Sequence, residues 1–93
     1  MMSQIPANLD KLKKGEIDRE IARAGMIAEL DAINLYEQMA SLAEKESIKK
    51  ILLDIAKEEK THVGEFQALL LREDAEQKKE LEAGKKEVDE KIK

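Results

Sequence analysis

Apolar residues recur in a helical rhythm along the middle of the chain. From about residue 16 to 44 the spacing alternates between four and three along a row made of Ala22, Met26, Glu29, Ile33, Tyr36, Ala40 and Ala43. This period is that of one face of an amphipathic helix. Further apolar residues flank the row, so we expect this helix to contact more than one neighbour: Ile17, Ile21, Ile27, Leu30 and Leu35.

The same rhythm returns after a short polar break at residues 44–47. From about residue 48 to 71 it follows Ile48, Leu52, Ile55, Glu59, His62, Phe66 and Leu69. Ser47 precedes this second helix and is expected to cap its first free amide groups. Because the break is short, we expect the two helices to be antiparallel. Gly25 and Gly64 indicate close backbone packing, since a helical glycine otherwise costs about 1 kcal/mol relative to alanine.

Both ends of the chain depart from this pattern. Residues 1–14 contain Pro6 and no helical period, and we expect a flexible arm there. Residues 74–77 read Asp-Ala-Glu-Gln, which has the form of a capping box and predicts a third helix over residues 74–93. From residue 72 onward 15 of 22 residues are charged, so we expect this helix to be solvated and to fray, or to dock on a neighbouring subunit.

The pattern therefore predicts an all-α single domain over residues 1–93, with an antiparallel helical hairpin at residues 16–71. Its aromatic residues are Tyr36 and Phe66 alone, and 41% of the residues are charged, so one hairpin buries only a small core. A second copy would supply the missing core and complete a four-helix bundle. We expect a homodimer for this reason.

Composition also excludes several classes of function. A net charge of −4 is too small to indicate nucleic acid or a membrane surface as partner. The chain has no cysteine, which excludes disulfides and thiolate metal sites. Neither a signal peptide nor a membrane-spanning run of apolar residues is recognisable, so we expect a cytoplasmic protein.

Polar residues occupy positions in both rows where apolar residues are expected. Glu29 and Tyr36 lie two turns apart on the first helix, and Glu59 precedes His62 by three positions on the second. A charge in a helix seam is costly unless it is paired or bound to a cation. At 3.6 residues per turn Glu59 and His62 lie nearly above one another, so the imidazole can bind one metal ion while the carboxylate bridges toward another.

These residues amount to half of a known ligand set. Di-iron carboxylate bundles take a Glu from each of two helices and a Glu-x-x-His from each of the other two. A symmetric dimer of this chain supplies two copies each of Glu29, Glu59 and His62. Its four carboxylates would be neutralised by two divalent cations. Carboxylate and imidazole ligands suit iron, manganese and zinc alike.

Each residue also has an ordinary interpretation. A lone helical histidine is more often exposed or hydrogen-bonded than bound to metal, a lone Glu29 reads as a solvated or salt-bridged residue, and Tyr36 reads as a core aromatic. Their joint placement in two seams favours the metal interpretation. Asp31 and Glu65 have two interpretations: they line a path by which cations reach the site, or they are plain exposed charges.

The segments Ala28–Tyr36 and Glu58–Phe66, which read AELDAINLY and EEKTHVGEF, resemble the encapsulated ferritin family, and more narrowly the ferritin-like segment of archaeal encapsulin systems. The resemblance extends over residues 17–72. It implies a ferritin-like four-helix bundle formed by two chains, with Glu29, Glu59 and His62 as iron ligands and Tyr36 beside the site.

The resemblance also implies a function. We expect a ferroxidase that oxidises ferrous iron with dioxygen or a related oxidant at a di-iron centre shared between two chains. The dimers are expected to build a larger homo-oligomer such as a ring. The iron mineral would be stored in an encapsulin shell, which places the protein within an encapsulin nanocompartment.

Two features depart from the family pattern. Ala28 stands where members often have a further acidic residue, and residues 87–93 differ from the short apolar targeting peptide that usually ends encapsulin cargo. We expect a truncated chain, a segment fused to its shell, or a different partner. Two other functions stay open: a metal-stabilised structural or metal-buffering assembly without turnover, and peroxide reduction at a di-iron centre, as in rubrerythrin-like proteins.

Overall fold

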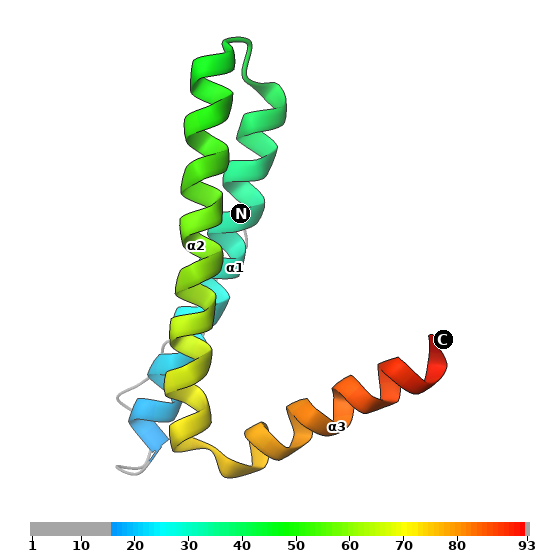
Figure 1. Cartoon of the computed structure of the whole chain (residues 1–93). Helices are drawn as coiled ribbons and strands as arrows, with labels where there is room; N and C mark the ends of the chain where they lie inside the picture. The colour runs from blue at the N-terminus through cyan, green and yellow to red at the C-terminus, as the bar shows by residue number, and fades with distance from the viewer. Residues whose placement is uncertain (1–15, 93) are drawn as a thin grey trace.

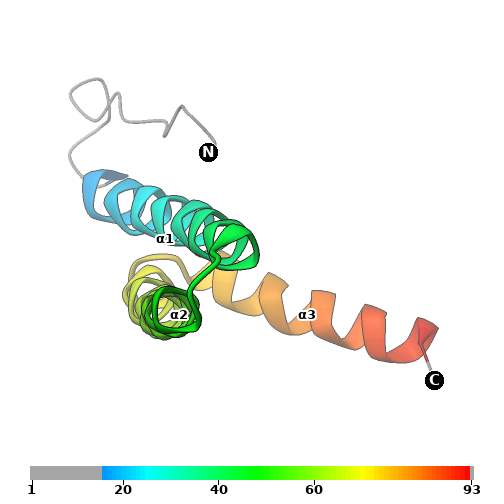
Figure 2. The same ribbon diagram turned by 90° about the horizontal axis from the view of Figure 1, so that it is seen from above.

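The computed structural model describes residues 16–92, which form three helices and no strand (Figure 1). Helix α1 spans Ile17–Leu42, α2 spans Glu46–Glu73 and α3 spans Ala75–Lys91. α1 and α2 are antiparallel and lie side by side, whereas α3 leaves the end of α2 and extends away from them (Figures 1 and 2). The predicted all-α fold, a hairpin followed by a C-terminal helix, is confirmed. The predicted arm at residues 1–14 lies outside the described residues.

The turn of the hairpin is shorter than predicted. α2 begins at Glu46, so Ser47 lies inside the helix, and the prediction that it caps the helix is wrong. The cap residue is Lys45, whose carbonyl accepts the amide N–H groups of Ile48 at 3.1 Å and Lys49 at 3.0 Å. The carboxylate of Glu46 in the first turn is favourable near the positive end of the helix dipole, which explains the earlier start.

The seam between α1 and α2 is built largely from small side chains. The buried apolar residues are Ala22, Ile33, Ala40, Ala56 and Leu70. Three alanines among five let the two backbones approach closely. At Gly25 an added Cβ would lie 2.5 Å from Cδ1 of Phe66, so the predicted close packing is confirmed there. At Gly64 no atom of the described residues outside its own helix backbone lies within 4 Å of such a Cβ, so the hairpin makes no close approach there, and a close approach to another chain stays a prediction.

A broad apolar surface stays exposed on the hairpin. Eight large side chains of the hairpin are between 42% and 81% exposed, and all but Leu30 and Leu53 fall on one row of each helix: Ile21, Met39 and Leu42 of α1, and Ile48, Ile51 and Leu69 of α2. Ile21 and Leu69 border the same groove, of about 310 Å³, so the rows to which they belong lie on one side of the hairpin. We call these six residues the apolar side. Among the described residues no large side chain is fully buried, as the composition predicted.

Asp74 joins the third helix to the hairpin. Its carboxylate accepts the N–H of Gln77 at 2.9 Å, which confirms the predicted cap, and also a hydrogen bond from Nη2 of Arg23 at 2.8 Å. The N–H of Gln77 and then the guanidinium of Arg23 hold the pKa of Asp74 below its usual value, although burial opposes them. α3 continues to Lys91 and buries none of its own residues within the single chain, and whether it is solvated or docks on a neighbouring subunit stays a prediction.

Within residues 16–92 no helix combines the length and the apolar character needed to span a bilayer.

Candidate metal centre

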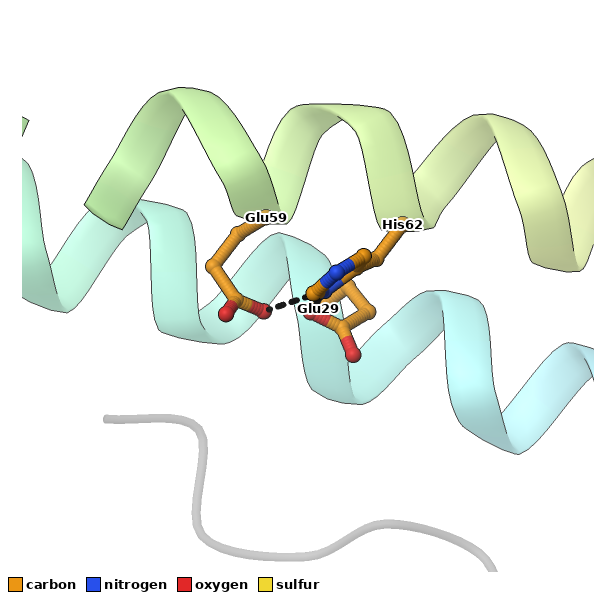
Figure 3. A group of neighbouring side chains, drawn as sticks. All are labelled: Glu29, Glu59 and His62. Carbon is orange, nitrogen blue, oxygen red and sulfur yellow. Dashed lines mark ion pairs between the residues drawn. The ribbon is translucent and has the colours of Figure 1, made fainter. Parts of the chain in front are cut away.

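Three predicted ligands converge in the seam of the hairpin (Figure 3). Glu29 comes from α1, and Glu59 and His62 come from α2. Nδ1 of His62 lies 3.5 Å from Oε2 of Glu29 and 3.5 Å from Oε2 of Glu59. One ligand atom from each residue lies within 4.8 Å of the other two. The sequence therefore predicted correctly that these three side chains would meet.

The local sequence explains this arrangement. Glu59 and His62 are three residues apart, so their side chains leave the same face of α2. That face turns toward α1, because Ala56 and Leu70 on it are buried in the seam. Glu29 lies between the buried residues Ala22 and Ile33 on the facing side of α1. The apolar period of each helix thus carries its polar residues into the shared seam.

The donor set fits a divalent cation. Two atoms bound about 2.1 Å from one ion are at most about 4.2 Å apart, and the two separations from Nδ1 of His62 to the glutamate oxygens, each 3.5 Å, lie within this limit. Oε2 of Glu29 is buried, and no hydrogen bond to it is found within the described part of the chain. A cation placed among the three side chains would compensate this buried carboxylate oxygen.

The centre is accessible on one side. The carboxylate side chains of Glu29 and Glu59 are 19% exposed, but the imidazole of His62 is 43% exposed. Lys60, next to Glu59 in sequence, forms an ion pair with Glu37 at 3.0 Å. Its positive charge is therefore engaged with a carboxylate outside the group. A metal ion bound here would keep room for ligands from outside the chain.

The other predicted site residues lie outside this group. Tyr36 is partly buried in α1, two turns beyond Glu29. Asp31 is only 2% exposed, so its interpretation as a plain exposed charge is wrong, whereas Glu65 is exposed on α2. Asp31 is two residues from Glu29, about 200° around the helix, and so faces away from the seam. The roles of Tyr36, Asp31 and Glu65 stay predictions.

The sequence pattern did not predict two contacts near the centre. The ring of Phe66 fills the space beside Gly25, one turn from the ligands, and Arg23 binds Asp74 at the base of the hairpin. Gly25 had indicated close packing, but its partner could be found only by setting α1 against α2 in the correct register. The Arg23–Asp74 contact joins residues 51 positions apart and leaves no periodic signal.

A helical hairpin that brings together one Glu from the first helix and a Glu-x-x-His from the second defines a ferritin-like helical protein with a candidate carboxylate–histidine metal centre. Comparison with known families makes this more specific. The model of the EncFtn-like family matches residues 4–86, and the chain belongs to this family. The resemblance to encapsulated ferritins is therefore confirmed.

Individual relatives agree with this assignment. The chain is 60% identical over 83 residues to the ferritin-like-encapsulin shell fusion protein of Pyrococcus furiosus, a match covering 89% of this chain and 24% of that protein. It is 40% identical over 67 residues to the encapsulin nanocompartment cargo protein EncC of Myxococcus xanthus, covering 72% of this chain and 51% of that protein. The chain thus spans about a quarter and about half of these relatives.

A solved structure shares the whole fold. The crystal structure of the encapsulated ferritin domain from Pyrococcus furiosus matches with a TM-score of 0.82 and 56% sequence identity. The match covers 97% of this chain and 94% of that one. The path of all three helices therefore agrees with an encapsulated ferritin domain.

Proposed function

We propose that two copies of this chain form a ferroxidase centre between them, with ferrous iron as the substrate. The observation that carries this proposal is the convergence of Glu29, Glu59 and His62 in one seam, where Nδ1 of His62 lies 3.5 Å from a carboxylate oxygen of each glutamate. One chain contributes two carboxylates and one imidazole, which is half of the ligand set of a di-iron bundle. Carboxylate and imidazole ligands bind several metals, and membership in the encapsulated ferritin family favours iron among them.

The exposed surface around His62 supports the proposal that a second copy of the chain binds there. His62 belongs to a row on α2 that also contains Ile48, Ile51, Ile55 and Leu69, at spacings of three, four and seven residues. Three of these apolar side chains are at least 50% exposed. A second hairpin packed on the apolar side would cover them and bring its own ligands to the open side of the imidazole. The dimer is thus proposed to complete the core and the centre together.

The charges balance in such a dimer. Two copies bring four carboxylates from Glu29 and Glu59, and two ferrous ions neutralise them. Each ferrous ion gives up one electron and becomes ferric, and dioxygen or a related oxidant accepts the electrons. The half-buried carboxylates hold the ions close together, while Tyr36 lies two turns along α1 as the proposed tyrosine beside the site.

We further propose that the chain acts with an encapsulin shell. The relative from Myxococcus xanthus is named as a cargo protein of an encapsulin nanocompartment, and the one from Pyrococcus furiosus is named as a fusion of a ferritin-like part with an encapsulin shell. The dimers would build a larger homo-oligomer in the lumen of the nanocompartment, in the cytoplasm. Ferric iron produced at the centre would be stored there.

A second candidate function is metal-driven assembly without turnover. The exposed apolar side and the absence of a fully buried large side chain among the described residues favour it. A metal that binds only the assembled state shifts the association equilibrium by mass action. Association with iron but without oxygen uptake would support this candidate over the ferroxidase.

The proposal is tested by ligand variants of the full chain. We expect the parent protein to consume oxygen with ferrous iron over many turnovers, and Glu59→Ala and His62→Ala to lower the rate by more than about 100-fold, because each removes a ligand at both halves of the centre. Glu44→Ala, which removes an exposed carboxylate in the turn, serves as the matched control and should keep the parent rate. Oxidation by the ligand variants at the parent rate would refute the ferroxidase centre.

A further inference from the structure

An aromatic ring occupies a notch in α1 one turn from the candidate centre. A Cβ added at Gly25 would lie 2.5 Å from both Cδ1 and Cε1 of Phe66 and 2.8 Å from its Cγ. These separations are far below a carbon–carbon van der Waals contact of about 3.5–4.0 Å. The ring therefore lies where any residue other than glycine would place its side chain. Helix α1 thus has a hole at this position, and α2 has the knob that fills it.

This contact and the ligand group belong to one register of the hairpin. Glu29 follows Gly25 by four residues on α1, and His62 precedes Phe66 by four residues on α2. Because the helices are antiparallel, the two steps lead in the same direction along the seam, by about 6 Å. The notch and the ligands are therefore adjacent layers of the same interface. Whatever sets the position of Phe66 against Gly25 also sets Glu29 against His62.

Few other large side chains are buried in the seam to fix this register. Among the described residues Ile33 and Leu70 are buried there, whereas Ala22, Ala40 and Ala56 contribute single methyl groups. Packed methyl groups form a shallow surface and resist sliding of one helix along the other only weakly. An aromatic ring seated in a notch resists such sliding more strongly, because the ring must first leave the notch. Sliding by one residue displaces a helix by about 1.5 Å, whereas metal–ligand distances must hold to about 0.2 Å. The ligand group consequently depends on the few large side chains that interlock across the seam, and Phe66 in the notch at Gly25 is one of them, a single turn away.

We propose that Phe66, seated in the notch at Gly25, is a positioning residue that holds Glu29 within metal-binding reach of Glu59 and His62. This inference rests on the proposed metal function. Phe66 itself carries no group that binds iron. It acts through the register of α1 on α2, and its removal or displacement would separate ligands that come from different helices.

Cobalt(II) binding by the full chain tests this role, with the visible d–d absorption as a readout of ligand geometry. We expect Gly25→Ala and Phe66→Leu each to weaken cobalt binding by about tenfold or more and to change the absorption, while far-UV circular dichroism reports folded helices. Leucine lacks the ring atoms that would collide with the new methyl group. The double variant should therefore bind more tightly than Gly25→Ala alone.

Gly64→Ala is the matched control, because open space surrounds that glycine in the chain, and it should bind cobalt within twofold of the parent. If both single variants are folded and keep the parent affinity and spectrum, Phe66 has a packing role only and the proposal is overturned. A double variant as weak as Gly25→Ala also overturns it. A parent protein whose cobalt spectrum is absent, or persists in Glu59→Ala, overturns the metal centre itself.

Discussion

Among the three candidate ligands, Glu29 has the surroundings that most clearly favour binding of a cation. Its Oε2 is buried without a hydrogen bond from the described residues, and Nδ1 of His62 is 3.5 Å away. Usual N–H···O hydrogen bonds are about 2.7–3.2 Å long, so the imidazole alone does not satisfy this oxygen. A buried polar group left without a partner costs about 1–3 kcal/mol, and a charged one costs more. A cation bound at this position would therefore stabilise the Glu29 carboxylate.

Replacing Glu29 by glutamine tests this view at the residue scale. We expect the melting temperature of the parent chain to rise with added metal, since a ligand at 100 times its dissociation constant stabilises by about 2.7 kcal/mol. Glu29→Gln keeps the size of the side chain but removes its charge, and its melting temperature should not respond to metal. Glu44→Gln should respond like the parent. An equal metal response in Glu29→Gln would mean that this carboxylate binds no ion.

The convergence of the three candidate ligands could be predicted from the sequence because each interrupts an apolar row. Glu29, Glu59 and His62 take seam positions, and the antiparallel hairpin brings them together. Asp31 could not be placed in this way. It lies off the seam, where helical period alone predicts exposure, yet it is 2% exposed. Phe66 was assigned to the seam, but its place against Gly25 depends on a register that periodicity does not specify.

At the scale of elements, the start of α3 depends on one carboxylate with two partners. Asp74 caps the helix through Gln77 and joins it to α1 through Arg23, 2.8 Å away. Arg23 also lies 3.7 Å from Glu20, and the charge of Arg19 adds to the lowering of the pKa of Asp74. A carboxyl group with a lowered pKa in the folded state contributes stability above its usual pKa and loses it as the pH falls through the lowered one.

We therefore expect the angle between α3 and the hairpin to become variable on acidification below about 3.8, the usual pKa of the group. Spin labels on cysteines introduced at the exposed positions Ser47 and Glu87 would report this angle through the distance between the two labels, measured by pulsed electron paramagnetic resonance. Asp74→Asn retains a capping side chain but not the charge for Arg23, so its distance distribution should be broad already at neutral pH. A narrow distribution in this variant at neutral pH would contradict the role of the ion pair.

The boundaries of elements were predicted less well than their existence. The apolar period of α1 and α2 is long enough to identify both helices and their facing sides. The turn was misplaced because the carbonyl of Lys45, and not the side chain of Ser47, receives the first amide groups of α2. The direction of α3 could not be predicted either, since Arg23 and Asp74 are 51 positions apart in the chain.

At the scale of the whole molecule, the apolar side is the feature that a single chain leaves unexplained. Ile51 on this side is 57% exposed, and it lies on the same row of α2 as His62. Burying such side chains against a second copy gains about 25 cal/mol for each Å² of apolar surface removed from water. Association and completion of the centre would then be one event.

A lysine substituted on either side of the hairpin tests which of its two sides forms the dimer interface. We expect Ile51→Lys to prevent dimer formation and to abolish iron binding, because a lysine there would have to be buried without a partner. Leu53 is 47% exposed but borders a groove with Glu37, Ser41 and Lys49 on the other side. Leu53→Lys is the control and should keep both the dimer and its iron. Native mass spectrometry measures both, and a dimer with bound iron in Ile51→Lys would exclude the apolar side as the interface.

A crystal structure grown with ferrous iron, with anomalous data collected at the iron edge, tests the central claim most directly. The account predicts two iron peaks near a twofold axis, in contact with Glu29, Glu59 and His62 from both chains. Iron held by the three residues of one chain without a partner, or iron peaks only at other residues, would contradict it.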